Sequence, residues 1–435
     1  MALGVVVAGG SDAALSVGTL LAIGVAVIVV YRRRSSIAGG AVAIVIFAMV
    51  LVLAVGSMPR DRPIYNVNPT LSVELLYVAG FAALICGLIA SGRLIPSGAP
   101  NSSSLDSRRP QSSRDQKDPS TFSAYLFIGC AAICLAVLNY ATGVVPILSG
   151  DINAARLNSI DYGVFGRFWP LILPVLQTNI ILAGILLIEG AVPRKFLVLA
   201  SASLLILMLN GGRSLFLFPL VAVALYWVEV RRPRLPWVIG GLSAGAVLLG
   251  AIGYLRDTTS GVVTNGSVLD SLDRSLQTGP RVLTLLISQE NTNGQFIAGD
   301  LLNFLSSNHE RSDRLVTVAI GRDPLVVGGS PPTIWGGLYL DFGIAGVLVG
   351  AFLLGLLLAG ARRSLHERGT AASAVWFSFF CAYILLGAYS YVSIRPSWIT
   401  VAILCCVLLR GRGLHENSHG LEVRRVSGRS RAASG

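Results

Sequence analysis

Long apolar stretches alternate with short polar segments along nearly the whole chain. Each stretch holds about the 20 residues that an α-helix needs to cross the ~30 Å hydrocarbon core of a membrane. Stretches of this length lie at residues 13–31, 36–56, 71–91, 122–142, 170–189, 237–255, 334–359 and 371–391. The pattern predicts an all-α, polytopic membrane protein.

One further apolar stretch, residues 196–230, has an awkward length. Its 35 residues overfill one membrane span and underfill two, and Asn-Gly-Gly-Arg-Ser at 210–214 interrupts it near the middle. Two short helices that meet at a recessed turn fit this pattern best. With a last short segment at 398–409, we expect about eleven transmembrane helices in all.

The composition supports a membrane protein and indicates its orientation. With 53% hydrophobic and 13% charged residues, the chain is too apolar for a soluble protein of its size. Lys and Arg accumulate in short cytoplasmic loops. An outer N-terminus and a cytoplasmic C-terminus place 22 of the 34 Lys and Arg inside and 14 of the 22 Asp and Glu outside. The net charge of +12 mostly reflects this orientation, so nucleic acid is not an expected partner.

Polar segments divide the chain into four parts. Residues 1–91 form an N-terminal segment of three membrane helices, and residues 92–121 form a Ser-, Arg- and Pro-rich linker that we expect to be disordered in the cytoplasm. Residues 122–409 form the expected catalytic membrane core. Residues 410–435 form a basic cytoplasmic tail that suits contact with anionic membrane lipids.

Two outer loops of the core mix apolar and polar residues. They are residues 143–169 and a large extracytoplasmic loop at 256–333, and long ordered loops of this kind are usually functional.

All six cysteines fall inside predicted spans, so we expect no disulfides. No His, Cys and carboxylate set has the spacing of a metal site, so neither a metal nor another cofactor is expected.

Three arginines near outer helix ends are candidate ligands for an anion. They are Arg156, Arg213 and Arg395. An ionisable group at membrane depth costs ~2.5 kcal/mol or more and is usually retained because it faces a polar cavity. The guanidinium fork matches phosphate oxygens, so a cluster of three could hold a pyrophosphate without a metal. In the alternative interpretation, each arginine extends to the lipid headgroups.

Carboxylates of the outer side are candidate proton acceptors. Asp341 is the one charge in residues 334–346, Glu310 lies in the densest charged run of the large loop, and Asp151 lies in the smaller loop. Each could act as a general base. The alternatives are that Asp341 pairs with an arginine and that Glu310 belongs to a solvated face. Tyr339, close to Asp341, is a candidate contact for a glycan.

Three short motifs resemble those of a known family when they are taken in order. They are Pro-Ile-Leu-Ser-Gly-Asp at 146–151 with Arg156, Gly-Gly-Arg-Ser at 211–214 between two spans, and Leu-Tyr-Leu-Asp-Phe-Gly at 338–343 after the large loop. Their order and topology are similar to those of the bacterial O-antigen and capsule repeat-unit polymerases, the Wzy-type membrane glycosyltransferases.

The resemblance implies an activity and a location. A polymerase of this family would have a metal-independent, GT-C-like fold and would extend repeat units carried by undecaprenyl pyrophosphate at the outer face of the bacterial cytoplasmic membrane. It implies that Arg156 and Arg213 bind substrate phosphates, whereas Arg395 rests on its position alone. A flippase and a chain-length regulator are the partners that it implies.

Two other functions compete with this interpretation. An O-antigen ligase has a similar architecture and donor, and its outer-loop histidine could correspond to His309. A lipid-linked oligosaccharide flippase or another transporter would carry ionisable residues along the middle of several spans. In this chain the ionisable residues gather at outer helix ends, which favours a surface site.

Overall fold

The described part of the chain is all-helical. The computed structural model describes residues 40–59, 66–94, 119–152, 155, 163–166, 168–190, 192–259, 267–287, 289, 292–298, 312–321, 332–388 and 396–405. Six helices among these residues are long and apolar enough to cross a membrane. The prediction of a polytopic helical membrane protein is therefore confirmed. The predicted first span and the basic tail lie outside the described residues, so the total of eleven helices stays a prediction, as does the GT-C-like architecture.

The helices follow the predicted apolar stretches closely. In chain order they are α3 (Ala41–Ser57), α4 (Leu71–Leu94), α5 (Pro119–Thr142), η2 (Pro146–Leu148), α7 (Gly163–Gly166), α8 (Trp169–Ile188), α9 (Arg194–Leu209), α10 (Arg213–Arg231), α11 (Leu235–Thr259), α12 (Val268–Leu286), α14 (Ser312–Ala319), α16 (Thr333–Arg368), α17 (Ala371–Gly387) and α18 (Pro396–Ile403). The stretch of awkward length forms two helices, α9 and α10, as predicted.

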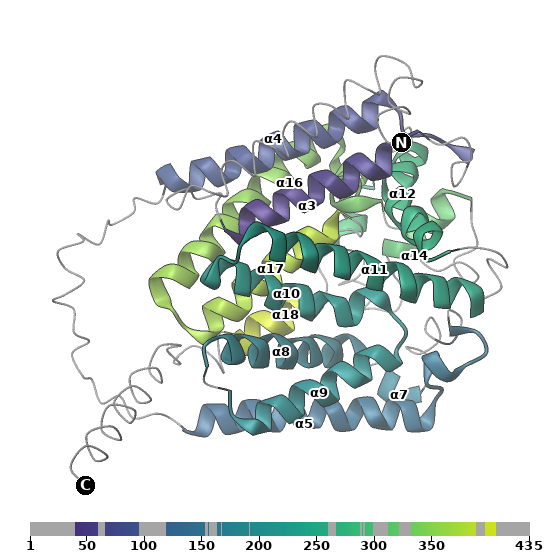
Figure 1. Ribbon diagram of the computed structural model, residues 1–435. Coiled ribbons are helices and arrows are strands. Elements are labelled where there is room, and N and C mark those ends of the chain that lie inside the picture. The colour runs from purple at the N-terminus through teal and green to yellow at the C-terminus, as the bar shows by residue number, and fades with distance from the viewer. Residues whose placement is uncertain are drawn as a thin grey trace, which may run out of the picture.

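The long helices lie side by side and run across Figure 1. The α9–α10 turn lies at the right-hand end of this bundle together with α7, α12 and α14, and we call this the loop end. The α8–α9, α10–α11 and α16–α17 connections lie at the left, which we call the opposite end. This arrangement places both predicted outer loops at one end of the bundle.

The backbones of helices α4 and α16 lie in close contact. A Cβ atom added at Gly87 would overlap the carbonyl oxygen of Phe352, and one added at Gly355 would overlap the carbonyl oxygen of Leu84. In membranes, small residues permit this approach, and van der Waals packing then stabilises the pair. The two glycines therefore allow α16 to pack closely against α4.

Helix α16 is broken at Gly343, where φ is 61° and ψ is −151°, a backbone conformation that is essentially restricted to glycine. The side chain of Leu338 would lie 2.5 Å from a Cβ atom at Gly350. These residues are twelve positions apart, about 18 Å along a straight helix. The segment before Gly343 therefore folds back along the segment after it.

This break corrects the predicted single span at 334–359. The spanning part of α16 starts after Gly343, and residues 333–342 form the other arm of a hairpin. Gly346 and Gly350 leave the space that Leu338 of this same element occupies. The apolar pattern runs unchanged through both arms, so it predicted one continuous helix.

A buried ion cluster joins three helices at the opposite end. The Glu229 carboxylate of α10 accepts hydrogen bonds from Arg362 Nε and His366 Nε2 of α16, both at 2.8 Å. It also accepts one from the backbone N–H of Ala41, at 2.8 Å. The Glu229 side chain is fully buried. A side chain at Gly40 would overlap this carboxylate, which explains the glycine at the start of α3.

Candidate functional site at the loop end

The turn between α9 and α10 leads into a helix N-terminus that has no side-chain cap. Gly211 has a φ of 72°, which favours glycine, and Gly212 is the N-cap of α10 and provides no side-chain cap. The first N–H groups of α10 therefore receive no cap from this residue, and the helix dipole favours a negative charge beside them. Arg213 is the first residue of this helix. Its side chain lies outside the described part of the structure.

Neighbouring helices hold the turn in place. The Tyr140 hydroxyl of α5 donates to the carbonyl oxygen of Ile206 at 2.9 Å, and Gln177 Nε2 of α8 donates to the carbonyl oxygen of Leu215 at 3.1 Å. Asn210 is 1% exposed, and its Oδ1 atom has no hydrogen-bond partner among the described residues. A buried acceptor of this kind is costly unless a donor reaches it.

The smaller outer loop packs against this turn. A Cβ atom added at Gly211 would lie 2.8 Å from Cγ2 of Ile152, a residue that is 4% exposed. The contact brings the motif at 146–151 next to Gly-Gly-Arg-Ser at 211–214. Asp151 is exposed and directly precedes the contact residue. Two of the three sequence motifs therefore lie together in the structure.

The described parts of the large outer loop form a small packed unit. Its core consists of Val282, Leu286, Phe296, Val316 and Leu340, which come from α12, residues 292–298, α14 and α16. Helix α12 begins with a capping box in which Ser267 and Asp270 bond reciprocally. Hydrogen bonds from the Ser267 hydroxyl and backbone N–H hold the pKa of Asp270 below its usual range. The capping box thus fixes where α12 begins.

Asp341 fastens this unit to the tip of the α16 hairpin. The carboxylate accepts from the backbone N–H groups of Phe296 at 2.9 Å and Ile297 at 2.7 Å, and from the Thr292 hydroxyl. The residue is fully buried. Its described partners are therefore a hydroxyl and two N–H groups, whereas the sequence suggested an arginine. These hydrogen bonds hold residues 292–297 against the hairpin.

Tyr339 and Arg281 also connect the large loop to the helices. The Tyr339 hydroxyl donates to the carbonyl oxygen of Ile287, the C-cap of α12, at 2.9 Å. Arg281 is fully buried and donates to the carbonyl oxygen of Gly56 at 3.0 Å and to Oδ1 of Asn68 at 3.2 Å. Sequence reasoning missed Arg281. The signal was available, because this arginine interrupts the apolar second half of an amphipathic helix.

Several predicted site residues cannot be placed. Arg156, Glu310 and Arg395 lie outside the described residues, as does the side chain of Arg213. Their predicted convergence on one anion stays a prediction. Within the described ranges, no three His, Cys, Asp or Glu side chains gather as a metal site requires. The described cysteines are all free; these are Cys86, Cys130, Cys134, Cys381 and Cys405.

Comparison with known proteins gives one match. The family model for O-antigen polymerases matches residues 38–390, from the start of α3 to the end of α17, and so includes both motif loops and the α16 hairpin. No curated protein matches the chain, and no solved structure does.

Proposed function

The chain belongs to the O-antigen polymerase family, and on that premise we propose that it joins oligosaccharide repeat units carried by undecaprenyl pyrophosphate. It is a multi-pass membrane polymerase. We place the reaction at the loop end and assign that end to the outer face of the cytoplasmic membrane. The observation that carries this assignment is the contact between Ile152 and the α9–α10 turn, which joins the two motif loops.

The pyrophosphate of the donor is proposed to bind at the start of α10. The N-terminus of this helix has no side-chain cap and therefore favours an anion. Arg213 begins that helix, and Arg156 follows the loop that touches it. Both guanidiniums would remain charged at any physiological pH and could neutralise phosphate oxygens in pairs. Arg395 is proposed as a third ligand.

The proposed reaction is a single glycosyl transfer. A hydroxyl oxygen of the acceptor sugar forms a bond to the anomeric carbon of the donor chain, and the bond from that carbon to the pyrophosphate oxygen breaks. Undecaprenyl pyrophosphate leaves with the electron pair, so negative charge grows on its oxygens in the transition state. Fixed cations beside a water-poor site stabilise this charge. The acceptor proton passes to a general base.

Asp151 is the best-supported base among the three predicted carboxylates. Asp151 is exposed, and the next residue, Ile152, contacts the α9–α10 turn where the pyrophosphate is proposed to bind. Asp341 remains a candidate, but its oxygens already accept bonds that hold residues 292–297. Tyr339, proposed as a glycan contact, likewise has its hydroxyl proton bonded to Ile287. Glu310 remains a candidate without a described position.

Reconstitution with one substrate tests the proposal. The purified chain in liposomes is given a repeat unit linked to undecaprenyl pyrophosphate, without another acceptor, and the lipid-linked products are resolved by size. A ladder of multimers supports polymerisation. Absence of extension with the authentic substrate contradicts it. Transfer that requires added lipid A core indicates a ligase, and movement of the unit across the bilayer without extension indicates a flippase.

A further inference from the structure

The connection between α10 and α11 carries an unusual density of positive charge. It reads Arg-Arg-Pro-Arg-Leu-Pro-Trp at 231–237, and we call it the α10–α11 corner. Arg231 donates to the carbonyl oxygen of Ile188 and so ties the corner to α8. Arg232 and Arg234 are exposed, and the side chain of neither makes a hydrogen bond or ion pair within the described part of the chain, where only their backbone groups are bonded. Their guanidiniums are available to an anion.

An apolar surface with open space continues from these charges along α11. Trp237 is 72% exposed, and α11 is the least buried of the six candidate spans. Cβ atoms added at Gly240, Gly241 and Gly245 would meet nothing within 4 Å. The first turns of α11 therefore offer a bare backbone surface beside an exposed indole, directly next to two arginines.

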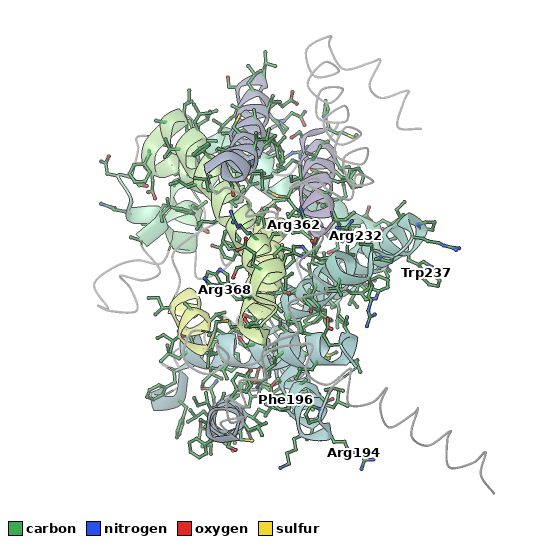
Figure 2. All side chains as sticks on the ribbon, turned by 90° about the vertical axis from the view of Figure 1, so that its left-hand side faces the viewer. Arg194, Phe196, Arg232, Trp237, Arg362 and Arg368 are labelled. Atoms are coloured by element: carbon green, nitrogen blue, oxygen red, sulfur yellow. The ribbon has the colours of Figure 1, made fainter. Side chains whose placement is uncertain are left out.

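The start of α9 provides a natural comparison at the same end of the bundle. Arg194 and Lys195 are also exposed, but the aromatic residue that follows them, Phe196, is fully buried and stacks on Tyr125 with ring centroids 6.2 Å apart. Figure 2 shows Arg194 and Phe196 on one side of this end and Arg232 with the outward-pointing Trp237 on another. The charge is therefore similar at both places, whereas an exposed indole beside glycines with open space is found at the start of α11 and not at the start of α9.

We infer that the α10–α11 corner binds an anionic phospholipid. The phosphate lies between Arg232 and Arg234, which can donate paired hydrogen bonds to its oxygens. Trp237 lies at the level of the headgroups, where indole rings are enriched in membrane proteins. One acyl chain follows the open surface at Gly240, Gly241 and Gly245. Basic clusters next to a membrane span attract anionic lipids, and the open surface adds the acyl contact. The inference does not depend on the proposed reaction.

Native mass spectrometry of the full chain tests this site. The protein is purified in detergent with phosphatidylglycerol or phosphatidylcholine, and retained lipid is counted over a range of concentrations. Each arginine that donates a charge-assisted hydrogen bond to the phosphate contributes about tenfold in affinity. The double variant Arg232→Gln/Arg234→Gln should therefore bind phosphatidylglycerol about 100-fold more weakly. The matched control Arg194→Gln/Lys195→Gln removes the same charge at the same end and should bind as the wild type does.

A second variant separates the lipid from its phosphate. Gly241→Leu fills the open surface without changing the charge, and it should also lower retention of phosphatidylglycerol, while glycerol 3-phosphate should not compete for the site. Equal losses in the two double variants would reduce the effect to general charge attraction and overturn the inference. Three other outcomes would also overturn the inference. They are retention of phosphatidylcholine equal to that of phosphatidylglycerol, retention of phosphatidylglycerol by Gly241→Leu equal to that of the wild type, and competition by glycerol 3-phosphate.

Discussion

Arg213 combines a fixed backbone position with a charge that the proposed reaction needs. Its N–H begins α10 at an uncapped turn, so the guanidinium and the helix N-terminus can act on the same anion. Lysine at this position would keep the charge and lose the planar fork. We expect Arg213→Lys to lower polymerisation about 10- to 100-fold, which corresponds to the loss of one charge-assisted hydrogen bond.

Initial rates of multimer formation from the lipid-linked repeat unit measure this effect. Arg194→Lys is the control, because Arg194 is exposed at the opposite end, far from the α9–α10 turn along the bundle. Both variants should have the thermal unfolding midpoint of the wild type. Unchanged turnover in Arg213→Lys would contradict phosphate binding by the guanidinium and would indicate that Arg213 only extends to the lipid headgroups.

Asp341 and Asp151 should respond differently to the same chemical change. In Asp341→Asn, the amide NH2 group would face backbone N–H groups that now donate to the carboxylate. An unsatisfied buried donor costs about 1–3 kcal/mol of stability, so this change should loosen residues 292–298. Asp151→Asn changes an exposed side chain, so we expect the wild-type unfolding midpoint with polymerisation lowered about 100-fold or more.

Unfolding midpoints, protease resistance of the large loop and polymerisation rates decide between the two carboxylates. A normally folded but inactive Asp341→Asn, together with an active Asp151→Asn, would make Asp341 the base and exclude Asp151. The reverse pattern supports the assignment proposed above.

At the scale of elements, the hairpin of α16 depends on one glycine. Gly343 has a conformation that a side chain strains by about 1–3 kcal/mol. Gly343→Ala should therefore lower the unfolding midpoint and release the contacts of Leu338 with the second arm. Gly360→Ala is the matched control, because it lies in the same element with open space around it. Alanine there should be neutral or stabilising. Equal midpoints in the two variants would contradict the hairpin.

The sequence predicted helix boundaries well where the length of an apolar stretch did not fit whole membrane spans, and less well where the length fitted one span. The stretch at 196–230 had the wrong length for one helix or for two full spans, so its turn was predictable. The stretch at 334–359 had a suitable length for one span, so nothing in its apolar pattern marked the break at Gly343. The same limit applies to the site. The sequence identified Asp341 as unusual, but its partners lie in a loop whose packing depends on tertiary contacts.

At the scale of the whole molecule, Glu229 joins segments that are distant in the chain. Its partners Arg362 and Ala41 lie 133 and 188 positions away, which explains why the sequence alone did not pair them. Removing one charge of a buried pair is costly, because the other charge stays buried without compensation. We expect Glu229→Gln to destabilise the protein by about 3 kcal/mol or more.

The thermal unfolding midpoint in detergent measures this loss. Glu367→Gln is the control, because it removes a carboxylate that pairs with Arg363 at the same end, with its side chain 56% exposed. A surface pair of this kind contributes at most about 1 kcal/mol. Similar midpoints for the two variants would show that the Glu229 cluster does not hold α3, α10 and α16 together.

The proposed reaction requires that the loop end face the outside of the cell, and the distribution of charge predicts this orientation. Exposed basic residues gather at the opposite end and should face the cytoplasm.

A membrane-impermeant maleimide on intact spheroplasts should label Leu269→Cys, since Leu269 of α12 is 70% exposed at the loop end. It should label Glu367→Cys only after lysis, with the wild type as the background. Labelling of Glu367→Cys in intact cells, with Leu269→Cys protected, would place the motif loops in the cytoplasm. Arg213 would then lie on the wrong side of the membrane for a lipid-linked donor displayed outside.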